Sequence, residues 1–256
     1  MRLWITRGIL AVAFVLAWEA AGLWVIDPFF ISRPSLVAAV LVEWTLNGRL
    51  IHHTWITVQE MLLGLALGSL VGIVVGLALG LRPGLARLLD PFVMGAYALP
   101  KVALGPLFIL WFGIGITMKI MLSAVIVFFL VFFNTLAGVR AVDRSLVAVI
   151  RMMGATRAQV VRKVVIPSAL VWIFLGLRVS VPYALIGAVV GEIIASNRGL
   201  GFLLSSAAGY LDTPGLFAAL IALMVLAILV NGGVDLLERR FLKWRPAEAA
   251  GDGGGL

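Results

Sequence analysis

Long runs of apolar residues alternate with short polar segments along the whole chain. Each run carries few charges, and a helix of about 20 apolar residues spans roughly 30 Å, the thickness of a bilayer core. The alternation therefore predicts an all-α protein that crosses a membrane several times. Six spans are expected, at residues 8–26, 55–81, 89–113, 117–138, 168–191 and 214–236.

The six runs divide the chain into four parts. Residues 1–30 are expected to form an N-terminal span, 31–54 an outer loop with a short interfacial helix, 55–240 a core of five spans, and 241–256 a flexible tail. The first run follows two arginines, as in a secretory signal peptide, but it is long for the apolar region of such a peptide, and Glu19 interrupts it. We expect it to be a retained span.

The composition excludes a soluble globular protein and offers no enzyme motif. Apolar residues make up 62% of the chain and charged residues 12%, more apolar surface than a soluble domain could bury. Cysteine is absent, and there is no GxxxxGK[ST] phosphate loop, HExxH or GxSxG. His52 and His53 have no third ligand nearby, so we expect ordinary interfacial residues and no metal site.

Basic residues gather on one side of the predicted membrane. With six spans the two termini share a side, and that side receives most of the 20 lysines and arginines. The opposite loops hold Arg33, Arg49, Lys119 and Arg198. Because positively charged loops stay in the cytoplasm, both termini and the loop at about 143–166 are predicted to be cytoplasmic. The net charge of +8 reflects this bias and does not indicate nucleic acid.

Two local patterns predict helix packing and a helix start. Glycine recurs every fourth residue in the second span, which favours close packing within the chain and leaves a contact between subunits as the alternative; the glycines are Gly64, Gly68, Gly72, Gly76 and Gly80. In the outer loop, Ser35 is the expected N-cap of an interfacial helix that ends near Asn47 and Gly48.

Charged residues near or within the spans are candidates for a translocation path. Lys101 follows Pro100 at a predicted helix break, where it lines a path for anions or, alternatively, snorkels or pairs with Asp90. Arg178 influences the path or pairs with helix-end carbonyls or another span. Glu192 lies near the outer mouth and is either a loop anchor or a functional group. The candidate path residues are Pro100, Lys101, Arg178 and Glu192.

The cationic segment RMMGATRAQVVRKVVIP, at 151–167, predicts two capped helices in the cytoplasmic loop. Asp143 can cap a helix that runs to Gly154, and Thr156 with Gln159 forms a T-x-x-Q capping box before Pro167. The inward apolar positions are expected at Leu146, Val149, Ile150 and Met153. An exposed Met-Met pair with a basic rim is typical of a docking surface for another protein.

Residues 148–167, AVIRMMGATRAQVVRKVVIP, resemble the EAA loop of ABC importer permeases. The glycine, the spacing and the final apolar-proline pattern match, whereas Ala148, Val149 and Ile150 replace the opening Glu-Ala-Ala. ISRPS (31–35), ALPKVALGPLFILWFGIG (98–115) and GLRVSVPYALIGAVVGEIIASNRGLG (176–201) resemble the permeases of the sulfonate, taurine and nitrate importers.

The resemblance implies the type I ABC importer permease fold, with five core helices and an added N-terminal one, in the inner membrane of a bacterium. It implies a second copy of the permease, cytoplasmic ATP-binding subunits that hold ATP and magnesium, and an extracytoplasmic solute-binding protein. Membrane lipid surrounds the assembly. The chain itself then holds no cofactor and catalyses no reaction.

The resemblance also assigns two contact regions. The EAA-like loop is the coupling helix that docks on the ATPase, through Val147, Ala148, Ile150, Arg151, Met152, Met153, Gly154, Ala155 and Thr156. Outer loops receive the binding protein, through Ser196, Asn197, Gly199, Gly201 and Thr213. The implied substrate is a small anion such as a sulfonate, taurine or nitrate. A thiamine precursor, a riboflavin-like molecule or an aromatic acid is the alternative, and an ion-coupled secondary transporter is a remote one.

Overall fold

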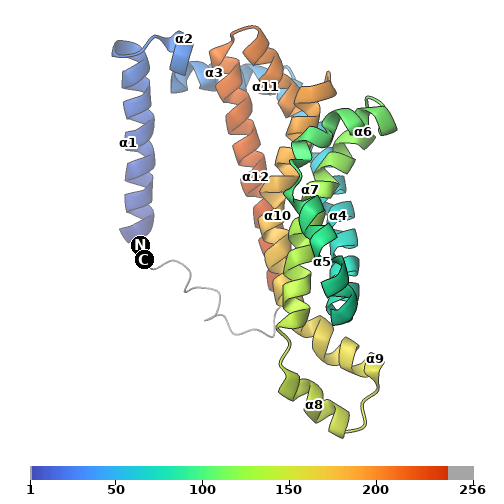
Figure 1. Cartoon of the computed structure of the whole chain (residues 1–256). Coiled ribbons are helices and arrows are strands. Elements are labelled where there is room, and N and C mark those ends of the chain that lie inside the picture. The colour runs from blue at the N-terminus through green and yellow to red at the C-terminus, as the bar shows by residue number, and fades with distance from the viewer. Residues whose placement is uncertain (1, 242–256) are drawn as a thin grey trace.

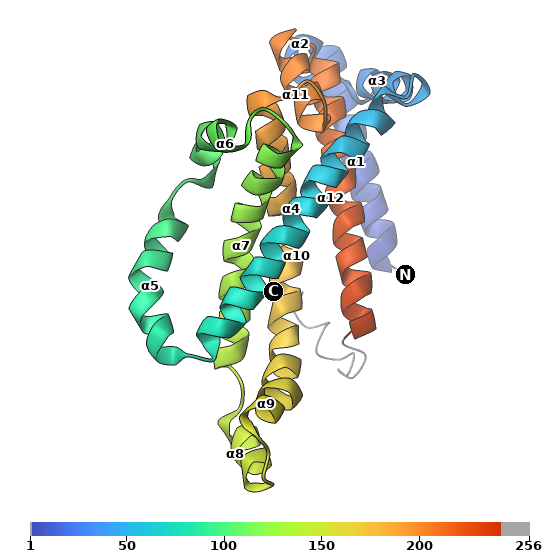
Figure 2. The same cartoon turned by 90° about the vertical axis from the view of Figure 1, so that its right-hand side faces the viewer.

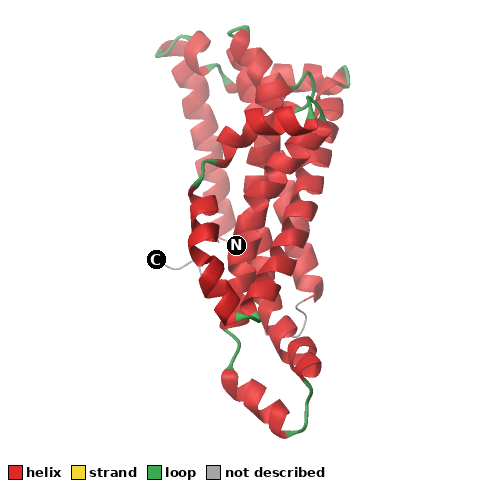
Figure 3. Cartoon of the chain, turned by 45° about the vertical axis from the view of Figure 1, so that its right-hand side comes forward, coloured by secondary structure: helices red, strands yellow, loops and turns green. Residues whose placement is uncertain are grey.

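A computed structural model describes residues 2–241 and the side chains of residues 5–240. Every regular element in this part of the chain is a helix (Figure 3). The tail expected at 241–256 lies outside the described residues, except for Phe241 at the end of the last helix.

Five helical runs are long and apolar enough to cross a membrane, and a bent pair makes a sixth. The predicted six spans are thus present, with shifted ends. The five runs are α1 (Arg2–Trp24), α4 (Arg49–Gly80), α7 (Ile116–Arg140), the continuous run of α9 (Arg157–Val160), η2 (Val161–Val165) and α10 (Ile166–Ala195), and α12 (Thr213–Phe241). Short helices complete the chain: α2 (Pro28–Ile31), α3 (Pro34–Leu46), α8 (Arg144–Met152) and α11 (Leu200–Gly209).

The third span is broken where the sequence places Pro100. Helix α5 (Pro83–Ala98) ends there, and η1 (Lys101–Leu104) and α6 (Gly105–Phe112) continue at a bend of 83°. The residue before a proline avoids the helical region, and Leu99 is extended, with ψ of 136°. Figure 2 shows α5 standing away from α7, with α6 crossing near the upper end of the bundle.

Helices α4, α7 and α10 form the centre of the bundle (Figure 2). The glycines of α4 lie against α7: a Cβ on Gly68 would lie 2.3 Å from the Ala124 carbonyl oxygen, and a Cβ on Gly76 would lie 2.7 Å from Thr135 Cβ. This face of α4 is therefore covered within the chain, which confirms the predicted helix packing and excludes the alternative contact between subunits.

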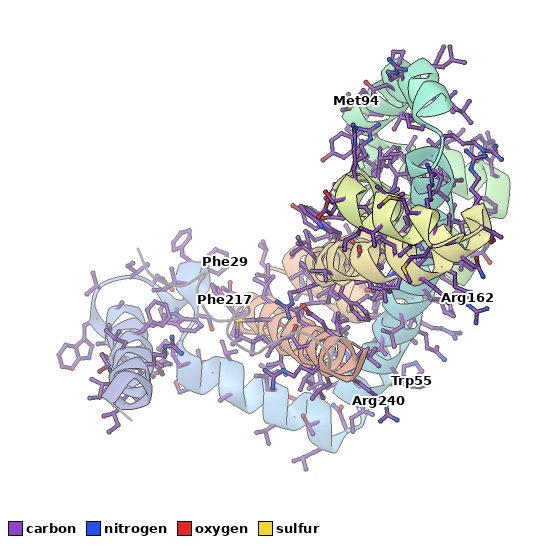
Figure 4. All side chains as sticks on the ribbon, turned by 90° about the horizontal axis from the view of Figure 1, so that it is seen from below. Phe29, Trp55, Met94, Arg162, Phe217 and Arg240 are labelled. Atoms are coloured by element: carbon purple, nitrogen blue, oxygen red, sulfur yellow. The ribbon has the colours of Figure 1, made fainter. Side chains whose placement is uncertain are left out.

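Helix α1 stands apart from the bundle over most of its length, as Figures 1 and 4 show from two directions. It joins the bundle at its upper end, where the Trp18 ring lies 5.2 Å from the Phe217 ring and Trp18 Nε1 donates to Ile31 O at 3.1 Å. Most side chains of α1 are thus exposed, which suits a helix surrounded by lipid.

The start of α3 differs from the prediction. Pro34 occupies the first turn and Arg33 the capping position, because proline with its fixed φ and missing N–H favours that place. Ser35 is therefore not the N-cap. Its N and Oγ donate to the Glu19 carboxylate at 2.9 and 2.8 Å, which ties α3 to α1. The predicted end of this helix, at Asn47 and Gly48, is confirmed.

Candidate functional site

The loop between α7 and α10 projects beyond the lower ends of the long helices (Figure 1). Asp143 Oδ1 accepts from Ser145 N at 2.7 Å and begins α8, while Gly154 takes a φ of +83° after its last turn. Thr156 and Gln159 exchange hydrogen bonds at 2.7 and 3.3 Å and begin α9. All these local helix ends agree with the prediction, because each is encoded by residues within a few positions.

The exposed face of α8 is apolar. Met152 and Met153 are each 80% exposed, and Leu146 and Val149 are also exposed. The prediction that Leu146, Val149 and Met153 point inward is wrong. Instead Val147, Ile150 and Ala155 pack toward the buried Val160 and Val165, because residues spaced by three or four share a helix face and only one such face of α8 meets the bundle.

Arginine and lysine side chains surround this face. Figure 4 views α8 and α9 from below, where they cover the end of the bundle and Arg162 points away from it. Arg144, Arg151, Arg157 and Lys163 are exposed as well. An unpaired methionine face with a cationic rim is suited to a protein partner with an apolar cleft and an acidic edge.

Helices α9, η2 and α10 form one continuous helical run from Arg157 to Ala195. The π-turn of η2 precedes Pro167, which lies in the first turn of α10. The proline thus lies inside this run and does not interrupt the helix.

A buried cluster of charges lies at the far end of this run, near Ala195. Glu60 from α4, Lys119 from α7 and Glu192 from α10 are between 1% and 5% exposed. Lys119 Nζ lies 2.8 Å from Glu60 Oε1 and donates to Ser196 Oγ at 2.8 Å. The assignment of Lys119 to an outer loop is thus wrong, since Gly191 allows α10 to cover the lysine stem.

Glu192 is the anchor of the loop that begins α11, which decides between its two predicted roles. Its Oε1 accepts from Thr57 Oγ1 at 2.7 Å, and its Oε2 accepts from the Gly201 backbone N–H. Thr57 Oγ1 in turn accepts from Leu200 N at 2.8 Å. The carboxylate and the hydroxyl thereby satisfy N–H groups of the first turn of α11, which has no side-chain cap of its own.

His53 completes this cap. Its Nδ1 accepts from Gly199 N at 2.9 Å, and its side chain is buried beside Phe202. It is therefore a structural residue of the cluster and not an ordinary interfacial one. The sequence signal for the cluster was the presence of charges inside apolar runs, which are costly unless paired, but nothing local identified His53 or Thr57 as partners.

The residues predicted for binding-protein docking are in different settings. Asn197 is exposed, and Ser196 lies half-buried against Lys119. Gly199 and Gly201 are buried and face Glu192 within the chain. Thr213 Oγ1 donates to Phe29 O and thereby ties α12 to α2.

The four predicted path residues do not converge on one place. Pro100 and Lys101 lie at the break of the third span, where Lys101 Nζ is 4.2 Å from the Tyr97 ring centre. Arg178 forms ion pairs with α12, at 2.8 Å to Asp235 and 2.6 Å to Glu238.

The three charged side chains among these residues each have a partner within the chain. Lys101 contacts aromatic rings, a second one being Phe129 at 5.0 Å, and Arg178 pairs with another span, as one of its two predicted interpretations stated. Glu192 belongs to the cap of α11 described above.

Comparison with known proteins decides the family. Residues 64–243 match the family described as binding-protein-dependent transport system inner membrane component. The chain belongs to this family. The match spans every element from the middle of α4 to the end of α12, so α8, Lys119 and Glu192 of this permease lie within it.

Several relatives of the permease cover most of its length. It is 36% identical over 241 residues to the putative aliphatic sulfonates transport permease protein SsuC of Bacillus subtilis (strain 168). This alignment covers 93% of this chain and 87% of the relative. It is 35% identical to the taurine transport system permease protein TauC of Escherichia coli (strain K12), over 93% and 88%. It is 39% identical to the riboflavin transport system permease protein RibX of Chloroflexus aurantiacus, over 84% and 81%.

A solved structure confirms the fold. The permease superimposes on a chain of the inward-facing MetNI methionine ABC transporter with a TM-score of 0.64, covering 73% of this chain and 93% of that one at 23% identity. The predicted all-α ABC importer permease fold is therefore correct, and the permease is a multi-pass membrane protein.

Proposed function

We propose that this permease is the membrane subunit of an ATP-driven importer. It works as a dimer of two copies, joined to cytoplasmic ATP-hydrolysing subunits and served by an extracytoplasmic binding protein. ATP and magnesium belong to the ATPase partner, and the permease itself catalyses no reaction. The observation that carries the proposal is the exposed apolar face of α8, which is capped at both ends and has no partner surface among the described residues.

The coupling step follows from the geometry of the loop. Met152 and Met153 enter a cleft of the ATPase, and the arginines around them face its acidic edge. When the ATPase dimer closes on ATP, it displaces α8 together with α9. The continuous run from Arg157 to Ala195 carries that displacement through the membrane, and the bundle then rocks toward the opposite side.

In the proposed orientation, this loop and both termini lie on the cytoplasmic side of a bacterial inner membrane. Arg82 and Arg87 at the start of α5, Arg140 at the end of α7, and Arg239 and Arg240 at the end of α12 support it, because cytoplasmic loops carry the excess of positive charge. The exposed Asn197 then lies at the outer side, within reach of the binding protein.

We propose a small sulfonate, such as taurine or an alkanesulfonate, as the substrate. The names of two relatives, SsuC and TauC, support this class, and Lys101 at the helix break offers a positive charge. A flat aromatic solute is the second candidate, because the relative RibX is named for riboflavin and the rings of Tyr97, Phe129 and Phe133 contact one another beside Lys101.

The buried carboxylates disfavour an ion-coupled carrier, because both already have partners within the chain. Such a carrier needs an intramembrane carboxylate that is free to bind its coupling ion. Glu60 is paired with Lys119, and Glu192 holds the start of α11.

Cysteine cross-linking tests the docking of α8. The chain has no cysteine, so Met152→Cys introduces a single thiol that a short bifunctional reagent joins to the co-expressed ATPase. Asn197→Cys is the matched control at the other end of the bundle, and it should join only partners outside the cytoplasm. Cross-linking of the ATPase by both variants, or by neither, would show that α8 is not its docking helix.

A further inference from the structure

A cavity of about 630 Å³ lies where the spans end next to α8, on the side of α8 that holds the inward-facing Val147. Its walls come from the end of α4, the start of α5, the end of α7, the start of α8 and the η2 turn. The volume is in the range of pockets that hold small molecules. This cavity is separate from the predicted path residues and from the buried outer cluster.

Three arginines line the cavity, and each comes from a different helix: Arg87 from α5, Arg140 from the last turn of α7 and Arg144 from the first turn of α8. No carboxylate lines it. Within residues 5–240 the ion pairs involve other side chains, and the neighbouring Asp143 already accepts from Ser145 N. The cavity therefore concentrates positive charge that the described chain does not neutralise.

The rest of the wall is apolar, formed by Leu81, Pro83, Val139, Val142, Val147 and Val165, with the Gly80 backbone. A cavity that joins a cationic part to an aliphatic part fits an amphiphilic anion. A hydrophilic metabolite would leave the valine wall uncovered by any apolar group.

The depth of the cavity matches the layer of lipid phosphates. Helix α7 has 25 residues and ends at Arg140, so it is about 37 Å long, which exceeds the roughly 30 Å of the hydrocarbon core. Helices α4 and α7 both end at this level, and Val139 contacts Gly80. The arginines thus lie beside the phosphate layer.

We propose that this cavity binds the headgroup of an anionic phospholipid from the cytoplasmic leaflet. The guanidinium groups of Arg87, Arg140 and Arg144 hold the phosphate, because arginine donates paired hydrogen bonds to phosphate oxygens. The valine and leucine wall contacts the glycerol and the first acyl carbons. This inference rests on the cytoplasmic orientation proposed above, and it makes the lipid a link between the α4–α5 turn and the coupling helix.

Native mass spectrometry of the purified full-length permease tests the proposal by titration with phosphatidylglycerol or phosphatidylcholine. We expect one tightly bound phosphatidylglycerol per chain, with at least ten-fold preference over phosphatidylcholine. Basic residues near a membrane surface contribute about 1 kcal/mol each toward anionic lipid, or about five-fold per arginine. The triple variant Arg87→Gln/Arg140→Gln/Arg144→Gln should therefore lose the site.

The matched control removes equal charge outside the cavity, as Arg157→Gln/Arg162→Gln/Lys163→Gln, and should bind as tightly as the wild type. Replacement of the three cavity arginines by lysine tests folding: because it keeps the charge but loses the paired hydrogen bonds, it should bind more weakly than the wild type and more tightly than the glutamine triple. Equal loss in both glutamine triples, or no preference for phosphatidylglycerol, would overturn the proposal.

Competition separates the lipid from a soluble anion. Glycerol phosphate and taurine at millimolar concentration should leave the lipid bound, and displacement by either would overturn the lipid assignment. The assay needs neither ATP nor a binding protein, so its failure leaves the proposed transport function standing. A failure of transport would likewise leave the lipid measurement unchanged.

Discussion

At the scale of single residues, the outer end of the permease depends on glycines that face charged side chains. Gly199 has a φ of +100°, and a Cβ there would lie 2.0 Å from Glu192 Oε1. Glycine is required for both reasons, because a side chain would be strained at this φ and would displace the carboxylate that caps α11.

Gly199→Ala should therefore destabilise the protein by about 2 kcal/mol or more. Gly209→Ala, at the other end of the same helix, is the control, since a Cβ there meets nothing within 4 Å. Thermal unfolding in detergent, followed by tryptophan fluorescence, compares the two. Equal unfolding temperatures for the two variants would contradict the assigned role of the glycine.

Lys119 is expected to be essential for stability because it pairs with a buried carboxylate. Lys119→Met leaves Glu60 without its partner, and the loss of one member of a buried ion pair costs about 3–5 kcal/mol. The double variant Lys119→Met/Glu60→Met removes both charges and should recover part of that loss. The same unfolding measurement checks this, and a single variant as stable as the wild type would disprove the pairing.

At the scale of the elements, the association of α4 with α7 depends on close backbone approach. A methyl group on Gly68 has no room beside the Ala124 carbonyl, so the helices must separate. Gly95 lies on α5 with nothing within 4 Å of a Cβ position.

Gly68→Ala should thus cost about 1–3 kcal/mol through overpacking, whereas Gly95→Ala should be neutral or gain up to about 1 kcal/mol from helix propensity. The free energies of unfolding of these two one-methyl variants measure the difference directly. If both substitutions stabilised the protein, the close contact of α4 with α7 would be refuted.

The elements also show what the sequence can and cannot predict. The spans, the break at Pro100 and the caps at Asp143 and Thr156 were predictable, because each depends on composition or on residues a few positions apart. The cap of α11 was not, since Glu192 acts together with Thr57, 135 positions away in the chain. The prediction of the inward face of α8 was wrong for a related reason. Only the packed structure shows which side of a short helix meets the bundle.

At the scale of the whole molecule, one helical run connects the loop that holds α8 with the buried charge cluster at Glu192. It begins at Arg157, after α8, and ends at Ala195, beside Glu192, and its 39 residues correspond to about 58 Å measured along the helix axis. On the proposed function, movement imposed on α8 by an ATPase would travel along this run to the loop that holds Asn197. We therefore propose this run as the connection between ATP use on one side of the membrane and the surface offered to a binding protein on the other.

We propose that the exposed face of α8 couples ATP hydrolysis to transport. The most direct test is uptake of labelled taurine or alkanesulfonate by vesicles that contain the permease, its ATPase and its binding protein, with ATP inside. Met152→Glu/Met153→Glu should reduce ATP-dependent uptake more than ten-fold while membrane insertion is unchanged, and Met152→Leu/Met153→Leu, which keeps the face apolar, should retain most of it. Uptake by the glutamate variant at the wild-type rate would contradict the account.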